Sequence, residues 1–295
     1  MQNAPTEGFT PETPLILGMM RLHDHPELTR PAKLADWVSA RVDEGLTVFD
    51  HADIYGAGDC ERLFGDALRA YPALAKRVRV ITKAGIVPAG QDSSSWQVKH
   101  YRAEADYLEN AINNALASLA VEQIDTFLIH RPDPLLQAGD VARILENAVT
   151  SGKVRQIGVS NFLPEQWRWL AQNTGLPLVC NQSQLSLAHT GPLFDGTLEA
   201  HLMDGLRWLA WSPLGGGNLA EQIPADVLDR ARNETGLDET ALAIAWLHQI
   251  PGAPVPVLGS MNPGRIHSAL RGAQSPLPRP LWYRLLESVR NRAVA

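Results

Sequence analysis

The sequence predicts an α/β protein built as one (α/β)8 barrel of the TIM type. Eight short apolar or β-branched runs alternate with longer segments of helical spacing, and eight is the strand number of this barrel. The length of 295 residues is usual for one such barrel. No tract rich in Pro, Gly or Ser is long enough to act as a linker, so we expect residues 1–295 to form a single domain.

The expected strands are short runs that end in polar or turn residues. They are residues 15–19, 47–50, 78–83, 124–130, 154–160, 178–182, 206–211 and 254–259. Apolar side chains recur at helical spacing over residues 32–45, 104–119 and 141–153, and Gly45 provides a helix stop. A doubly wound open sheet would show the same alternation, but no G-x-G-x-x-G fingerprint follows an early strand.

Composition excludes several classes of function. The net charge of -6 and the absence of a long Lys/Arg cluster argue against nucleic acid as a partner. The only two cysteines, Cys60 and Cys180, are too few for a disulfide framework. The first fourteen residues lack the pattern of a signal peptide, and no apolar stretch approaches a membrane span. We therefore expect a cytoplasmic protein with no membrane partner.

Three of the expected strands end in an ionisable residue. These residues are Asp50, Lys83 and His130, and Tyr55 lies five residues beyond the first of them. Parallel strands of a barrel converge on one mouth, so the four groups should meet there and form a proton-transfer site. Each residue alone is more often structural or solvated, and only the set of four favours catalysis.

Five motifs resemble the aldo-keto reductase family, in family order. They are VFDHADIYG at 48–56, ITKAG at 81–85, LIHRPD at 128–133, GKVRQIGVSNF at 152–162 and AWSPLGGG at 210–217. The resemblance implies an (α/β)8 barrel that reduces an aldehyde or ketone with a nicotinamide cofactor, usually NADPH, and without a metal. Under it, Asp50, Tyr55, Lys83 and His130 match the catalytic tetrad.

The chemistry of these side chains agrees with such roles. Tyr55 would give a proton to the carbonyl oxygen, and Lys83 as an ammonium is expected to lower the pKa of Tyr55. Asp50 would keep Lys83 charged and in place. His130 would hydrogen-bond the carbonyl oxygen and orient it.

The resemblance also implies a set of cofactor-binding residues. The set is Gly18, Met19, Asp50, Ser160, Asn161, Gln182, Trp211, Ser212, Leu214, Gly215, Gly216, Ser260 and Arg265. Amides and hydroxyls suit the nicotinamide carboxamide, an indole suits its ring, and an arginine suits a 2'-phosphate. Gly259, Ser268 and Ala269 depart from the family pattern, so a preference for NADPH over NADH is expected but weakened, and NADH stays possible.

Two other functions stay open at this point. His23 and His25 form an H-x-H pair after the first expected strand, as in metal-dependent barrel hydrolases. A non-catalytic NADP-binding subunit on the same barrel is the third possibility. The insert 84–103, which carries Trp96, is a candidate mobile flap, whereas His51 and Asp53 are expected to pack or to support the tetrad. The substrate and the oligomeric state do not follow from the sequence.

Overall fold

The computed structural model describes residues 13–91, 95–217, 219–290 and 293. Its main strands run parallel and follow one another in the closed order β1-β10-β9-β8-β7-β6-β3-β2, which confirms the predicted (α/β)8 barrel. These strands are β1 (Ile16–Gly18), β2 (Val48–Asp50), β3 (Arg79–Ala84), β6 (Ile124–Ile129), β7 (Val154–Ser160), β8 (Leu178–Gln184), β9 (Arg207–Trp211) and β10 (Val255–Leu258). Every one of them overlaps an expected run, and β3 and β8 extend beyond theirs, to Ala84 and Gln184.

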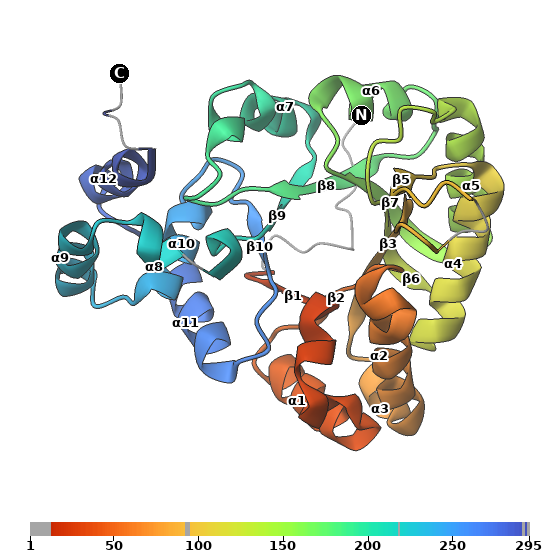
Figure 1. The fold of residues 1–295 in the computed structure, drawn as a ribbon, viewed down its shortest axis with the longest axis horizontal. Helices are drawn as coiled ribbons and strands as arrows, with labels where there is room; N and C mark the ends of the chain where they lie inside the picture. The colour runs from red at the N-terminus through yellow and green to blue at the C-terminus, as the bar shows by residue number, and fades with distance from the viewer. Residues whose placement is uncertain (1–12, 92–94, 218, 291–292, 294–295) are drawn as a thin grey trace. The chain divides into compact units, whose positions relative to one another are not determined.

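The chain forms two compact units. The N-terminal unit comprises Thr13 and residues 17–181, and the C-terminal unit comprises Pro14–Ile16 and residues 182 onwards. The helices of the N-terminal unit are η1 (Met19–Asp24), η2 (Pro26–Thr29), α1 (Pro31–Asp43), η3 (Tyr55–Gly58), α2 (Asp59–Ala70), α3 (Pro72–Ala75), α4 (Ala105–Leu119), α5 (Ala138–Thr150) and α6 (Pro164–Ala171). Figure 1 shows α1, α2, α4 and α5 as successive neighbours, and contacts join each to the next.

Amphipathic spacing explains the helices of the N-terminal unit. In α4, Leu108, Ile112, Ala115 and Leu119 are buried, as a stripe at intervals of three and four residues predicts. Gly45 follows α1 with a φ of 86°, which is the left-handed conformation that ends helices. Gly65 on α2 lies directly against the Ser118 carbonyl of α4, and any larger side chain there would overlap it.

The C-terminal unit has its own apolar interior. Its helices are η4 (Gly191–Leu193), α7 (Thr197–Asp204), η5 (Gly215–Gly217), α8 (Leu219–Gln222), α9 (Ala225–Thr235), α10 (Glu239–His248), α11 (Pro263–Ala273) and α12 (Arg279–Arg290). Residues Ala241–Leu247 of α10 are all buried, so this helix is apolar on every side. Trp246 and Trp282 stack at 4.9 Å, and each indole N–H donates to the other residue's carbonyl.

The insert after β3 contains a feature that the sequence did not predict. Strands β4 (Ile86–Val87) and β5 (His100–Tyr101) pair antiparallel as a small separate sheet. Trp96, between them, is 79% exposed. Residues 92–94 of the predicted flap lie outside the described residues, as do residues 1–12, most of the N-terminal segment that lacks the pattern of a signal peptide. None of the described helices is long and apolar enough to cross a membrane.

Candidate active site

Lys83 is the centre of a buried polar cluster in the N-terminal unit. Its Nζ lies 2.7 and 2.8 Å from the two carboxylate oxygens of Asp50 and 2.7 Å from the carbonyl oxygen of His51. It also donates to the Tyr55 hydroxyl at 3.2 Å. Asp50 ends β2 and Lys83 lies near the end of β3, its parallel neighbour, so strand pairing brings the two side chains together.

The lysine keeps its charge although it is only 1% exposed. Burial alone lowers the pKa of Lys83, but Asp50 and Tyr55 beside it outweigh burial and raise that pKa above its usual value. The cluster therefore holds an ammonium that is paired with a carboxylate and contacts a phenol.

The prediction that Tyr55 has a lowered pKa is wrong when all the groups around its hydroxyl are counted. Burial raises the pKa of Tyr55 above 10.0 and is the largest cause, whereas Lys83 acts in the predicted downward direction and is outweighed. Asp50 adds to the rise because its negative charge disfavours a phenolate. The phenol is consequently protonated at neutral pH, with an ammonium at hydrogen-bond distance.

His130 follows β6 and faces Tyr55. The two ring centroids lie 6.2 Å apart with the ring planes at 84°, and the His130 backbone N–H donates to the Ala84 carbonyl at 2.8 Å. Burial, followed by the charge of Lys83, lowers the pKa of His130 to about 2, so its imidazole is neutral. Its Nδ1 is buried and has no hydrogen-bond partner among the residues that the structure describes.

Asp53 forms hydrogen bonds to Lys83 and to Tyr107, a partner that the sequence did not predict. The Asp53 backbone N–H donates to the Lys83 carbonyl at 3.0 Å, and its carboxylate accepts a hydrogen bond of 3.1 Å from the Tyr107 hydroxyl of α4. Burial, with a smaller contribution from nearby Glu61, raises the pKa of Asp53 to about 7 against the opposing effects of Tyr107 and Lys83. No sequence signal connects Asp53 with a tyrosine on α4.

Two further buried polar groups belong to the same unit. His51 packs against the edge of Phe64 at 4.6 Å, and burial lowers the pKa of His51 to about 3. Glu61 of α2 accepts a hydrogen bond of 2.5 Å from the Thr82 hydroxyl, and burial raises the pKa of Glu61. His51 and Asp53 thus pack around the tetrad residues.

Ser160 and Asn161 lie at the end of β7. The Asn161 side-chain amide donates to the His130 carbonyl at 3.2 Å and to the Ser160 hydroxyl at 2.8 Å. Asn161 has a φ of 62°, a left-handed conformation that asparagine tolerates better than most residues. Asn181, which the sequence reasoning missed, exchanges hydrogen bonds of 3.3 and 3.0 Å with the backbone of Phe162 and so fixes this turn.

Gly18 and Met19 adjoin the same strand ends. Gly18, the last residue of β1, pairs in register with Asp50, and Met19 begins η1 with a fully buried side chain. The N-terminal unit therefore brings Gly18, Met19, Ser160 and Asn161 to the strand ends that carry the tetrad residues.

The C-terminal unit holds the other expected cofactor-binding residues. Gln182 is buried in β8, and Trp211 ends β9. The segment that follows turns sharply, because Gly215 donates to the Ser212 carbonyl at 2.9 Å and Gly217 to the Leu214 carbonyl at 3.0 Å. Ser212, Gly215 and Gly216 all have positive φ values, at 52°, 59° and 79°.

Ser260 and Arg265 lie at the start of α11. The Asn262 side chain caps this helix by accepting from the Arg265 N–H at 3.2 Å, and the Ser260 hydroxyl accepts from the Asn262 N–H at 3.3 Å. Ser268, one of the departures from the family pattern, donates to the Asp238 carboxylate, which caps α10. Arg265 is exposed.

The two histidines of the H-x-H pair have separate partners. His23 lies 3.6 Å from an Asp59 carboxylate oxygen, and His25 lies 3.1 Å from Glu27. Within the described part of the chain, no three His, Cys, Asp or Glu side chains come together as a metal site.

A model of the Aldo/keto reductase family matches residues 14–285. This chain belongs to the aldo/keto reductase family. As a member of that family, it is an NAD(P)H-dependent oxidoreductase that reduces carbonyl groups. The resemblance that the motifs predicted is confirmed, and the hydrolase and non-catalytic alternatives are not favoured.

Curated relatives cover nearly the whole of this aldo/keto reductase. A 6-dehydroglucose reductase of Agrobacterium fabrum is 38% identical over 285 residues, which are 95% of each chain. A second 6-dehydroglucose reductase, from Novosphingobium aromaticivorans, is 38% identical over 94% of this chain and 92% of its own. Oxidoreductase YdhF of Escherichia coli is 34% identical over 92% of this chain and 91% of its own.

Solved structures share the fold of this aldo/keto reductase. The thermostable aldo-keto reductase Tm1743, in complex with the inhibitor epalrestat, has a TM-score of 0.78 at 23% identity, over 96% of this chain and 97% of its own. An aldo/keto reductase from Klebsiella pneumoniae, in complex with NADP and acetate, has a TM-score of 0.77 at 22% identity, over 95% of this chain and 92% of its own.

Proposed function

We propose that this protein reduces an aldehyde or ketone to an alcohol with NADPH as the hydride donor and Tyr55 as the proton donor. The observation that carries the proposal is the contact of the Lys83 ammonium with both the Asp50 carboxylate and the Tyr55 hydroxyl. An acid that loses a proton beside a fixed cation leaves a stabilised anion.

Each tetrad residue has a task in this reaction. Bound NADPH supplies the hydride that the carbonyl carbon receives. The carbonyl oxygen then takes the proton of the Tyr55 hydroxyl, and the phenolate left behind lies at hydrogen-bond distance from Lys83. Solvent returns a proton to Tyr55, so one hydride and one proton are consumed for each alcohol formed. The high pKa of Tyr55 keeps the phenol protonated until the oxygen gains negative charge.

Asp50 and His130 act without giving up a proton. Asp50 holds the Lys83 ammonium through two hydrogen bonds, which fixes its direction as well as its charge. His130 is neutral at neutral pH, so one of its ring nitrogens can donate a hydrogen bond to the carbonyl oxygen. Such a bond strengthens as the oxygen becomes negative, and it therefore favours the transition state over the substrate.

The residues present fit a nicotinamide dinucleotide. In the N-terminal unit, Ser160 and Asn161 offer a hydroxyl and an amide for the nicotinamide carboxamide. In the C-terminal unit, Gln182 and Trp211 offer a second amide and an indole face. We propose the same cofactor-binding role for Gly18, Met19 and Asp50 of the N-terminal unit. Two structures of Klebsiella pneumoniae relatives, one with NADP and one with NADPH, support this choice of cofactor.

Two segments of the C-terminal unit suit the phosphates. A side chain added at Gly216 would meet no neighbouring atom, so the backbone at Gly216 is open to a pyrophosphate. Near the start of α11, the Ser260 hydroxyl and the exposed Arg265 guanidinium suit a 2'-phosphate. Leu214 and Gly215 complete the turn.

The names of two relatives suggest which class of carbonyl substrate to test first. Both relatives, at 38% identity, are named 6-dehydroglucose reductase, so we propose an oxidised sugar as the substrate class. Simple aldehydes and ketones serve as comparison substrates in the same NADPH oxidation assay.

The decisive experiment is the Tyr55→Phe substitution. The variant lacks the acid but keeps the ring, so its kcat should fall about 10²- to 10⁴-fold. Its Kd for NADPH, measured by cofactor fluorescence, should stay within threefold of wild type. Tyr71→Phe is the matched control, because Tyr71 is 44% exposed and lies outside the site. Wild-type turnover in Tyr55→Phe would refute the assignment of the acid.

A further inference from the structure

His23 lies directly on the loop that carries Tyr55. Its imidazole covers Gly56 so closely that a side chain at Gly56 would overlap the Cδ2 and Nε2 atoms of His23. We propose that His23 is a positioning residue, which holds the loop 55–59 in place and so keeps the Tyr55 hydroxyl on Lys83. This inference rests on the proposed role of Tyr55 as the acid.

The loop 55–59 needs stabilising contacts from outside because its backbone has three successive positive φ angles. Gly56 (φ 58°) and Ala57 (φ 55°) both adopt the left-handed conformation, and Gly58 (φ 93°) also has a positive φ. Ala57 has a Cβ atom and disfavours this region, so the run of three is a strained turn. Such a turn persists only where its surroundings determine it, and it directly follows the residue whose hydroxyl must stay 3.2 Å from Lys83.

His23 contacts both ends of that turn. Its ring covers Gly56 at the start, and its Nε2 lies 3.6 Å from Oδ2 of Asp59, the first residue of α2. A second contact joins the same two elements: the Cys60 thiol of α2 lies 3.9 Å from the carbonyl oxygen of Met20, which belongs to η1 as His23 does. One side chain from η1 therefore closes the loop at two points.

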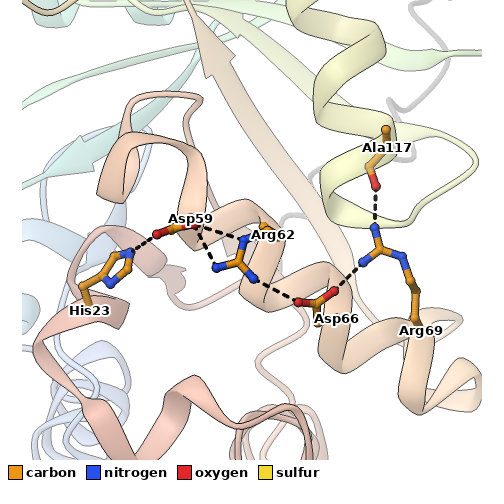
Figure 2. Close-up of polar contacts among 6 residues, drawn as sticks. All are labelled: His23, Asp59, Arg62, Asp66, Arg69 and Ala117. Carbon is orange, nitrogen blue, oxygen red and sulfur yellow. Dashed lines mark hydrogen bonds and ion pairs between the residues drawn. The ribbon is translucent and has the colours of Figure 1, made fainter. Parts of the chain in front are cut away.

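Asp59 is itself held by a row of charged side chains along α2. Figure 2 shows His23, Asp59, Arg62, Asp66 and Arg69 in sequence, with Arg69 reaching the carbonyl oxygen of Ala117 on α4. Two guanidinium nitrogens of Arg62 donate to Oδ1 of Asp59, at 2.9 and 3.0 Å. The other carboxylate oxygen, Oδ2, is the one that lies near His23. Asp66 then accepts from Arg62 at 3.2 Å and from Arg69 at 2.7 Å.

These pairs are exposed and individually weak, so their effect is to orient the Asp59 carboxylate rather than to stabilise the fold. The carboxylate in turn lies beside the His23 ring that covers Gly56. The row links the position of the Tyr55 loop to α2 and α4, two helices of the same unit.

A double-mutant cycle tests the proposal. The variants are His23→Ala, Gly56→Ala and both together, with His25→Ala as the matched control, since His25 pairs with Glu27 and not with the loop. We expect His23→Ala to lower kcat about tenfold, to leave the Kd of NADPH unchanged and to raise the primary deuterium isotope effect. A misplaced acid slows the chemical step, whereas a general loss of folded protein would not raise the isotope effect.

Gly56→Ala should lower kcat further than His23→Ala, because the new methyl group and the imidazole need the same space. In the His23→Ala background the imidazole no longer occupies that space, so the additional loss should be clearly smaller than in the wild-type background; what remains comes from the positive φ of Gly56 and the Cys60 sulfur at 3.1 Å. If Gly56→Ala alone does not fold but the double variant is soluble, that result would also support the contact between His23 and Gly56. If neither folds, the kcat and isotope effect of His23→Ala decide.

The readouts separate this inference from the proposed function. A wild-type protein that reduces no carbonyl compound would refute the proposed function, and the same cycle measured in the thermal midpoint would still decide whether His23 holds the loop. Additive effects of the two substitutions on the midpoint would overturn the contact. Wild-type kcat and isotope effect in His23→Ala would overturn the positioning role.

Discussion

Asp53→Asn should remove a pH dependence of stability that the wild-type protein shows near neutrality. Burial raises the pKa of Asp53 to about 7 in the folded protein, against the ordinary 3.8 of a free aspartate side chain. The groups that face its carboxyl are Tyr107 of α4, Glu61 of α2 and Lys83 of β3. Between the two pKa values the folded chain holds a proton that the unfolded chain has lost, so stability falls as pH rises.

The size of the effect follows from the two pKa values. The loss has a slope of up to about 1.4 kcal/mol per pH unit and ends above the folded pKa. From pH 5 to pH 8 it amounts to about 2.5 kcal/mol, or about 5 °C in Tm for a chain of this length. Burying an amide in place of the carboxyl carries a cost that does not depend on pH, so it cancels in the slope.

Thermal unfolding followed by circular dichroism at several pH values measures this directly. The wild-type Tm should fall more steeply with pH than the Tm of Asp53→Asn, by about 5 °C over the range. Tyr107→Phe is an informative companion, because the Tyr107 hydroxyl lowers the pKa of Asp53 and its loss should extend the slope to higher pH. Parallel curves for wild type and Asp53→Asn would refute the raised pKa.

Three further predictions concern single contacts. Arg265→Ala should raise the KM for NADPH about tenfold and leave that for NADH nearly unchanged, and an equal effect on both would remove the 2'-phosphate role. Gly65→Ala should destabilise the protein by about 3 kcal/mol in urea unfolding, because its methyl group overlaps the Ser118 carbonyl, whereas Gly139→Ala on α5 meets no neighbour and should be neutral or stabilising. Lys83→Met should cost about 3–5 kcal/mol because it leaves Asp50 buried without its cation, and adding Asp50→Leu should recover part of that loss.

Local patterns predicted most of the fold. Each of the eight strands overlaps an expected run, with β3 and β8 extending one and two residues beyond it, since a buried parallel strand needs a short apolar or β-branched stretch and a turn at its end. The pair β4 and β5 was missed because strands of two residues have no periodicity to detect. The stripe on α4 and the stop at Gly45 were read correctly from spacing alone.

The core of the site could also be predicted. Asp50 and Lys83 meet because adjacent parallel strands place their ends at one edge, which the order of the motifs already implies. Asp53 and Tyr107 could not be paired in this way. Their contact depends on how α4 is rotated about its axis, and packing of the whole unit decides that rotation.

The sequence by itself determined the strand and helix alternation, the family and the identity of the groups around Lys83, because these depend on local patterns and on residue types. Only the tertiary structure decided the protonation of those groups. The predicted fall in the Tyr55 pKa counted one neighbouring charge, whereas the folded chain adds burial, which outweighs that charge. It likewise decided that His23 lies on Gly56, since desolvation and close packing depend on every atom that surrounds a group.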